Sequence, residues 1–410
     1  MTVVQRQRSS NVEVRNLIAA AIDGANDELR RINLEIWNNP EVMFEEVKAC
    51  KLITDWLEAR GWAVERGVYG IKTAFEARFS VRPGGRTQVD ALPEIGHACG
   101  HNLIATSSLA SAVGVSAAMT SLNLPGTVVL MGTPAEETGG GKYIMANNGA
   151  WKDCDACIMT HGMPQFSTPV CITKASWKFR AKFHGKASHA AAAPWNGRNA
   201  CDAIVMAYNG IGLLRQQISK SDSIQGVILS AGKAPNIIPD FSEGSFSLRS
   251  NNAPELELLR KRIIPVFEGA AATTGCTVEL FWDALYEDVV TNMTLAERYR
   301  QYMITELGMR PEDMVPLDVA AIKYEQNGSS DMGNCTYITP GIQAMFRIDA
   351  QDMPHTPLFQ KASGTDFSHA EALRAGKANA FIGIDVLIDD AFYGDVHAEW
   401  KDAMQKAGRL

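Results

Sequence analysis

A thiol and two imidazoles occur close together in residues 96–102, which read Gly-His-Ala-Cys-Gly-His-Asn. Cysteine thiolate and neutral imidazole are ligands that Zn²⁺ and its neighbours among the divalent metals prefer. The spacing of Cys99 and His101 lets one turn direct both side chains to the same point, and the glycines allow the backbone that turn. The segment predicts the first half of a metal site, although a lone Cys-Gly-His triplet also arises through packing alone.

Two further groups of polar residues follow apolar, strand-like runs. The adjacent acids Glu136 and Glu137 come after residues 128–131. His161 comes after residues 157–159. In open α/β sheets, ligands bind outside the carboxyl ends of the strands. We therefore expect these side chains to converge with the first half of the metal site on one crevice.

The acidic pair has two interpretations. Adjacent carboxylates inside a strand would point to opposite faces of the sheet. Here Pro134 and the glycines at 139–141 indicate that the strand has already ended, so Glu136 and Glu137 can face one site. The alternative is a solvated acidic loop, which would be the better interpretation if the pair did not follow a buried strand. The glycines do not form a phosphate-binding loop, because the GxxxxGK[ST] spacing is absent.

The elements that must position these groups alternate along the chain. Expected are helices at residues 12–35 and 45–60, a strand at 71–81, a buried helix at 103–119, and strands at 127–131 and 156–159. Helices and strands return at residues 295–307, 342–348 and 365–388. This alternation predicts an α/β fold with a mainly parallel sheet and helices on both faces.

Five short motifs follow one another along the chain: Asp-Ala-Leu-Pro at 90–93, Gly-His-Ala-Cys-Gly-His-Asn at 96–102, Thr-Pro-Ala-Glu-Glu at 133–137, Gly-Lys-Ala-Ser-His-Ala at 185–190 and His-Thr-Pro at 355–357. In this order they resemble the successive motifs of the aminoacylase/carboxypeptidase-type binuclear metallohydrolases. The nearest branch of that family contains the amidohydrolases that cleave indole-acetyl-amino acids and aminobenzoyl-glutamate. Within this branch, the chain is most similar at residues 96–102 and 193–200 to dipeptidases that act on Xaa-Arg and β-alanyl-Lys substrates.

The resemblance implies a zinc-peptidase-like catalytic domain with two divalent metal ions, zinc or manganese, in each subunit. Glu136 would be the general acid/base that takes a proton from the attacking water and passes it to the departing amine. Asp90 would orient one of the histidine ligands from behind. The implied metal ligands are Cys99, as a bridging thiolate, His101, Glu137, His161 and His355.

Residues 173–288 follow a different order of elements. Strands and helices are expected in the order βαββαβ, the split unit of a ferredoxin-like domain, at residues 177–183, 199–214, 226–231, 242–248, 255–274 and 276–281. This order resembles the lid and dimerisation domain that is inserted in the family. It implies a homodimer whose catalytic domain is divided into residues 1–172 and 289–410.

Three lid residues have implied roles. His189 would reach an active site, typically that of the partner subunit, and hold the tetrahedral oxyanion. Asn236 and Arg249 would contact the carbonyl or carboxylate of the substrate. Without the resemblance, His189 is an ordinary histidine at a strand end and Arg249 an ordinary surface arginine. Of the remaining histidines, we expect structural roles for His97 and His184 and solvated side chains for His369 and His397.

The composition narrows the partners and the compartment. The 39 basic and 46 acidic residues give a net charge of −7 without a long basic run, so nucleic acid is not an expected partner. Residues 1–11 lack an apolar leader, and no later segment has about 18 uninterrupted apolar residues, so we expect a soluble, cytoplasmic protein without a membrane partner. The scattered cysteines indicate reduced thiols, and we interpret Cys154-x-x-Cys157 as packing.

Three functions remain open from the sequence. The first is hydrolysis of dipeptides or N-acyl amino acids, and the second is amide formation or acyl transfer, which the same ligands could serve. The third is a family member that binds without catalysis. One departure from the family favours the third: only residues 86–89 separate a Gly-Gly turn from Asp90, too few for a central strand of about five or six residues. Either residues 72–81 fill the strand position, or the sheet lacks a strand and the metal site is weakened.

Overall fold

The computed structural model describes residues 3–82, 87–93, 99–318 and 328–410, with the backbone alone for residues 3–11 and 87–93. The chain forms two compact units. The first contains Met1–Ile172, Val289–Gln326 and Ser330–Leu410, and the second contains Thr173–Asp288 and Asn327–Ser329.

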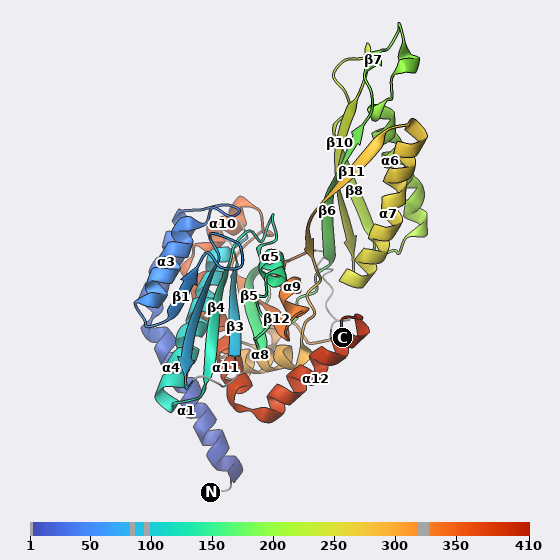
Figure 1. Ribbon diagram of the computed structural model, residues 1–410. Coiled ribbons are helices and arrows are strands. Elements are labelled where there is room, and N and C mark those ends of the chain that lie inside the picture. Colours follow the sequence, from blue (N-terminus) through green and yellow to red (C-terminus); the bar gives the residue numbers. More distant parts are fainter. Residues whose placement is uncertain (1–2, 83–86, 94–98, 319–327) are drawn as a thin grey trace. The chain divides into compact units, whose positions relative to one another are not determined.

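A six-stranded sheet is the centre of the first unit (Figure 1). Its strands lie in the order β1-β2-β4-β3-β5-β12, with β4, β3, β5 and β12 parallel and β1 and β2 antiparallel at one edge. The mainly parallel sheet predicted from the sequence is therefore confirmed. The strands are β1 Ala63–Arg66, β2 Phe75–Val81, β3 Thr87–Pro93, β4 Gly126–Thr133, β5 Ala156–Pro164 and β12 Gly341–Ile348.

Helices cover both faces of this sheet. Along β4, Val128 and Leu130 pack into a large core with the long helices, whereas Val129 and Met131 pack on the other face with Met145 of α5. A strand buried on both faces explains why the sequence is a continuous apolar run there. The helices are α1 Val3–Gly24, α2 Asn26–Asn38, α3 Val47–Glu58, α4 His101–Leu122, α5 Gly141–Asn147, α8 Met293–Thr305, α9 Met332–Thr336, α10 Pro357–Ser363, α11 Asp366–Ile388 and α12 Asp390–Lys406.

Helix α4 is the buried helix expected at residues 103–119. Its length and composition would suffice to cross a membrane, but 78% of its apolar window is buried inside the fold. It packs against α11 and α1, as well as against the sheet. The small side chains of α4 allow this close packing. The helix begins at His101, one of the candidate metal ligands.

The segment before Asp90 is long enough after all. Strand β3 includes the Asp-Ala-Leu-Pro motif itself and pairs with β4 along all seven of its residues, from Thr87 to Pro93. It also pairs with β5 from Gln88 to Asp90. The expectation of a missing strand is therefore wrong, and so is the alternative that residues 72–81 replace it, because β2 lies antiparallel on the other side of β4. The side chain of Asp90 and all of His97 lie outside the described residues.

The predicted helix at residues 12–35 is interrupted. It forms parts of two helices, α1 and α2, which are separated at Ala25. Gly24 weakens the end of α1, and Asp27 and Glu28 in the first turn favour a new helix start through their interaction with the helix dipole. Helix α2 continues to Asn38, three residues beyond the predicted end of this segment.

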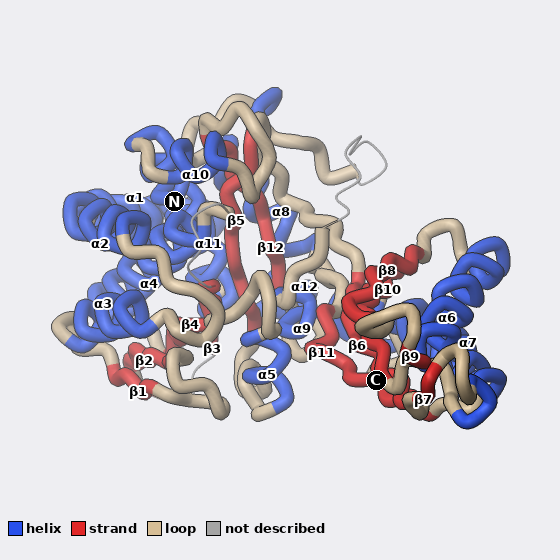
Figure 2. Tube along the Cα trace, turned by 90° about the horizontal axis from the view of Figure 1, so that it is seen from above, coloured by secondary structure: helices blue, strands red, loops and turns tan. Residues whose placement is uncertain are grey.

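The second unit has the predicted βαββαβ order. Its four-stranded antiparallel sheet has the order β11-β6-β10-β8, and α6 and α7 lie side by side along it (Figure 2). In the core between sheet and helices, the rings of Phe179 and Phe246 stack, and Phe267 packs edge-on against both. A two-stranded ribbon, β7 with β9, completes the unit. The elements are β6 Ala175–His184, β7 Ser188–His189, α6 Ala200–Leu214, β8 Ser223–Ser230, β9 Ile237–Ile238, β10 Phe241–Ser250, α7 Ala253–Thr274 and β11 Thr277–Tyr286.

Candidate metal centre and active site

Cys99 and His101 lie on either side of Gly100 at the start of α4. Gly100 has a φ of 78°, a left-handed conformation that glycine adopts without strain. A Cβ atom at this position would also lie 3.1 Å from the ring of Phe359. The turn anticipated from the glycine therefore exists, and Cys99 and His101 are both buried beside it.

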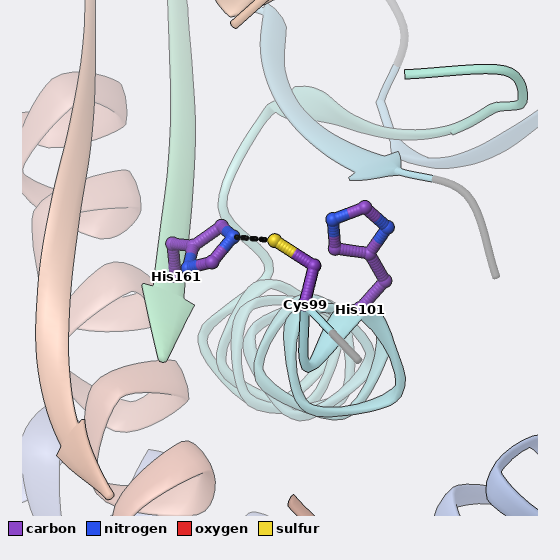
Figure 3. Close-up of side chains that lie close together, drawn as sticks. All are labelled: Cys99, His101 and His161. Atoms are coloured by element: carbon purple, nitrogen blue, oxygen red, sulfur yellow. Dashed lines mark hydrogen bonds between the residues drawn. The ribbon is translucent and has the colours of Figure 1, made fainter. Parts of the chain in front are cut away.

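His161 approaches Cys99 from strand β5. Its Nε2 atom lies 3.4 Å from Cys99 Sγ, and its ring is edge-on to that of His101 (Figure 3). His161 Nδ1 lies 2.7 Å from the carbonyl oxygen of Gly162, which fixes Nδ1 as the donor and leaves the lone pair of Nε2 facing the thiol. Burial lowers the pKa of His161, so its imidazole is neutral, as a ligand must be. His161 lies inside β5, which continues to Pro164, and not after the strand as predicted.

Glu137 connects the remaining two ligand candidates. Its Oε1 atom lies 3.7 Å from His101 Nε2 and 3.2 Å from His355 Nε2. His355 belongs to the loop before α10 and has a φ of 72°, an uncommon backbone conformation for a residue other than glycine. Such conformations persist where the surroundings impose them, and they are frequent at functional sites.

The donor atoms of these side chains form three overlapping groups, in each of which all atoms lie within 4.8 Å of one another. Cys99 belongs to two of the groups, once with His101 and His161 and once with Glu137 and His355. A donor shared in this way suits a thiolate that bridges two ions. Thiolate, imidazole and carboxylate are ligands for divalent metals such as zinc, so the residues fit a metal pair.

The charge environment of Cys99 supports the same interpretation. Burial, followed by the carboxylates of Glu137 and Glu136, raises the pKa of the Cys99 thiol well above its usual value. Without a cation, the thiol would therefore stay protonated. A nearby divalent cation reverses this preference, because it favours the thiolate directly.

Glu136 differs from the other acid in its grouping. It lies with His101 and Glu137 in the third group and belongs to neither of the groups that contain Cys99. Both acids therefore face one site, as expected from the strand ending at Thr133. Glu136 thus lies next to the candidate ligands without sharing a donor group with the Cys99 thiol, which is where a general base would be needed.

The lid residues fall into two groups within the second unit. His189 pairs with Ile237 in the β7–β9 ribbon, and the backbone N–H of Ala190 donates to the carbonyl oxygen of Asn236, so His189 and Asn236 are close together. Arg249 lies near the other end of β10, opposite Ser176, and donates to Ser329 Oγ. At about 3.4 Å per residue, β10 separates the two groups by more than about 25 Å. One lid therefore cannot offer all three side chains to one small substrate.

The other histidines have varied surroundings. His369 is buried, contrary to the expectation of a solvated side chain, because α11 packs its polar face against Asn33 of α2. His184 lies beside Glu279 on the sheet of the second unit. His397 of α12 is half-buried against the ring of Tyr393.

Buried charges next to the site were not anticipated. Glu46 is buried just before α3 and accepts from the backbone N–H of Ala135. Lys142 and Asp331 form a fully buried ion pair between α5 and the start of α9. Nothing in the local sequence distinguishes these residues from surface charges, because their partners are distant in the chain.

Comparison with known proteins identifies the family of this chain. Residues 87–387 match Peptidase family M20/M25/M40. An Xaa-Arg dipeptidase of Mus musculus is 36% identical over 95% of this chain and 92% of its own, and a p-aminobenzoyl-glutamate hydrolase chain of Escherichia coli K12 is 31% identical over 69% and 63%. A Bacillus subtilis protein described as a dinuclear metal-binding peptidase of the M20 family has the same fold, with a TM-score of 0.65, 19% identity and coverage of 89% of this chain and 99% of that one. The chain therefore belongs to peptidase family M20/M25/M40.

Proposed function

We propose that this protein hydrolyses the amide bond of dipeptides or N-acyl amino acids, with two divalent metal ions in each subunit and Glu136 as general acid/base. The observation that carries the proposal is the sharing of Cys99 between two groups of donors, with Glu136 beside them but in neither. Zinc and manganese are the proposed ions, because the site combines a thiolate and imidazoles with carboxylates.

The side chains divide the chemistry among themselves. When bound, the metal pair supplies polarisation of the amide carbonyl and activation of the attacking water. Glu136 accepts the proton of that water and delivers it to the departing amine. The carbonyl oxygen of Gly162 accepts from His161 Nδ1, which orients the ring and leaves Nε2 free to hold a metal. Glu137 and His355 keep the second group of donors in place through their close contact.

The substrate class follows from the relatives. The Xaa-Arg dipeptidase aligns with nearly the whole chain, so dipeptides with a basic C-terminal residue are the first candidates. The aminobenzoyl-glutamate hydrolase supports N-acyl amino acids as the second. The impaired, non-catalytic alternative loses its structural basis, since β3 is complete.

We also propose a homodimer formed through the second unit. Strand β8 is an edge of its sheet and exposes Val227, Ile228 and Leu229, and α6 exposes Leu213 beside it. Edge strands with exposed apolar side chains favour pairing with another chain. A dimer would also explain how three separated residues serve one active site, because His189 and Asn236 could come from one subunit and Arg249 from the other.

All eight cysteines are thiols rather than disulfides, which supports a reducing compartment, and we propose the cytoplasm.

Metal content and turnover test the catalytic proposal together. The purified protein, stripped of metal and reloaded with Zn²⁺ or Mn²⁺, should regain hydrolysis of a panel of Xaa-Arg and Xaa-Lys dipeptides, N-acetyl amino acids and aminobenzoyl-glutamate. The expected stoichiometry is about two ions per chain. Tight binding of two ions without hydrolysis of any member of the panel would contradict the proposed substrates.

The oligomeric state tests the dimer proposal. Val227→Lys on β8 should convert the dimer to a monomer in light scattering, because a charge at a buried edge is costly. Phe281→Lys is the matched control, since Phe281 is exposed on β11 at the opposite edge of the same sheet. Equal effects of both changes, or none, would exclude β8 as the interface.

A further inference from the structure

The loop that carries both acids has few side chains of its own to hold it. It runs from Ala135, shortly after the end of β4, to Lys142 in the first turn of α5, and Gly139, Gly140 and Gly141 make up much of its second half. Gly139 and Gly140 have positive φ values of 115° and 67°. Glycine runs lose much conformational freedom on ordering, so contacts from outside the loop must fix its position.

A buried carboxylate holds the first end of this loop. Ala135 directly precedes Glu136, is buried and has a φ of 63°, which is unfavourable for alanine. Its backbone N–H donates to Glu46 Oε1 at 3.3 Å. The Glu46 carboxylate is itself fixed by the N–H of Phe44 and the hydroxyl of Thr73. The backbone N–H of the strained residue Ala135 is therefore bound by Glu46, which directly precedes α3, and not by a neighbouring strand.

A buried ion pair holds the second end. Asp331 Oδ2 accepts from the backbone N–H of Lys142 at 2.9 Å, and Asp331 Oδ1 accepts from Lys142 Nζ at 2.7 Å. Both side chains are 0% exposed. Burial by itself lowers the pKa of Lys142, but the carboxylates of Asp331 and Glu136 outweigh burial and raise it above its usual value. The ammonium therefore stays charged, near Glu136.

The loop cannot relax between these two ends without breaking its own packing. The backbone N–H of Gly140 donates to the carbonyl oxygen of Ala135 at 2.9 Å. A Cβ atom at Gly141 would lie only 1.6 Å from the carbonyl oxygen of Pro134. A shift of either end would therefore move the segment that contains Glu136 and Glu137.

We propose that Glu46, Lys142 and Asp331 are positioning residues, which clamp the two ends of the Ala135–Lys142 loop so that Glu136 and Glu137 keep their places at the metal centre. The proposal rests on the catalytic role proposed for Glu136, and it goes beyond that role by assigning the buried charges behind it. None of the three belongs to the groups of metal-donor side chains.

If the Lys142–Asp331 pair served stability alone, substitutions that preserve stability would leave kcat unchanged. Removing one partner of a buried pair leaves an uncompensated charge and destabilises the fold, whereas replacing both with apolar or neutral groups is often harmless to stability. The double variant Lys142→Met/Asp331→Leu removes both charges and also the acceptor for the Lys142 N–H. The double variant Lys142→Met/Asp331→Asn removes the charges but keeps an acceptor for it.

The test compares these two double variants for unfolding midpoint, metal content, kcat and KM. Both should unfold within a few degrees of wild type and retain metal. The Leu-containing variant should lose at least about tenfold in kcat with little change in KM, since small misplacements of a catalytic group are costly. The Asn-containing variant should keep most of its kcat.

A second pair of variants tests the other end of the loop. Glu46→Met should lower kcat, whereas Glu46→Gln, which keeps an acceptor for the Ala135 N–H, should have a kcat near that of wild type.

Two controls separate this inference from the proposed function. Arg298→Met removes a charge from the Arg298–Asp385 pair between α8 and α11, and should lower stability while kcat remains near wild type. Glu136→Gln tests the general base in parallel. If Glu136→Gln retains turnover, the base assignment fails, yet a kcat loss in the Leu-containing variant would still support the clamp. A folded, metal-loaded Leu-containing variant with wild-type kcat would overturn it.

Discussion

At the scale of single residues, neighbouring side chains of the same type have different surroundings. Glu136 and Glu137 are adjacent, yet Glu137 contacts His101 and His355, whereas Glu136 shares a donor group only with His101 and Glu137. The difference supports the proposed roles of Glu137 as a metal ligand and of Glu136 in proton transfer. Substitution by the isosteric amide distinguishes the two roles, because an amide cannot accept and pass on a proton.

Glu136→Gln should abolish turnover while metal content stays near wild type. Loss of a general base predicts a decrease in kcat of at least about 10²-fold. Glu137→Gln should instead lose metal, because it removes a charged donor from the group with Cys99 and His355. Metal analysis and steady-state kinetics of both variants check this, and equal metal loss in the two would contradict the assigned roles.

Cys99 should be protected by metal. If it bridges the ions, Cys99→Ala should lose bound metal, and a thiol reagent should modify Cys99 faster in the metal-free protein than in the loaded one. Its high pKa without a cation makes the absolute rate low, so the comparison must be between the two forms at one pH. Mass spectrometry of the labelled peptide gives both rates. Identical rates would make Cys99 a packing residue.

At the scale of elements, the docking of α11 on α2 brings a polar network into the core. Asn33 of α2 contacts His369 of α11 and accepts from Asn102 of α4, the residue that follows the proposed ligand His101. Asn102 also donates to the carbonyl oxygen of Ser363. The network therefore joins three helices at the start of α4, where the metal site begins.

Protonation of His369 should destabilise this docking. Burial, with a further contribution from Arg30 and against that of Asp366, lowers the pKa of His369 to about 4. The unfolded chain, with a histidine pKa of about 6.5, binds a proton that the folded chain does not bind between these values. His369 therefore contributes stability that is complete above about pH 6.5 and is lost as the pH falls toward about 4, by up to about 1.4 kcal/mol per pH unit.

Denaturant unfolding from pH 7 to pH 4.5 measures this effect. The His369→Gln variant controls for all other titrating groups, so the difference between the two pH profiles isolates His369. The wild type should lose more free energy of unfolding than the variant as the pH falls. Parallel profiles would show that His369 does not titrate in this range.

At the scale of the whole molecule, the chain forms two units, and the three residues of the second unit with proposed roles in substrate binding or catalysis are separated. His189 and Asn236 lie at one end of the second unit and Arg249 at the other. This separation supports a dimer in which the lid of one subunit completes the site of another. Subunit mixing can test it directly, because each active site would then draw on two chains.

Mixing His189→Ala subunits with Glu136→Gln subunits should restore activity. After random exchange, half of the dimers are mixed and one of the two sites in each is complete, so up to about a quarter of wild-type activity is expected. Glu137→Gln mixed with Glu136→Gln is the matched control and should show no recovery, since both changes lie in the catalytic unit. The absence of recovery in the first mixture, after exchange is proven, would mean that His189 does not act across subunits.

The sequence by itself determined the types and order of the candidate ligands and the division into elements. Cys99, Gly100 and His101 could be interpreted together because a turn is a local property. A continuous apolar run indicated β4, and the order of apolar segments indicated the βαββαβ unit. These signals act over a few residues. They allow a prediction wherever neighbours along the chain also determine the structure.

Only the tertiary structure decided which residues are buried together. The strand before Asp90 looked too short until pairing with β4 and β5 supplied its hydrogen bonds, and His369 looked solvated until α11 packed against α2. Lys142 and Asp331 are 189 residues apart, so no local pattern reveals that each is the other's partner. A buried charge is tolerated only where a partner compensates its desolvation, and that partner is chosen by the fold rather than by the neighbouring sequence.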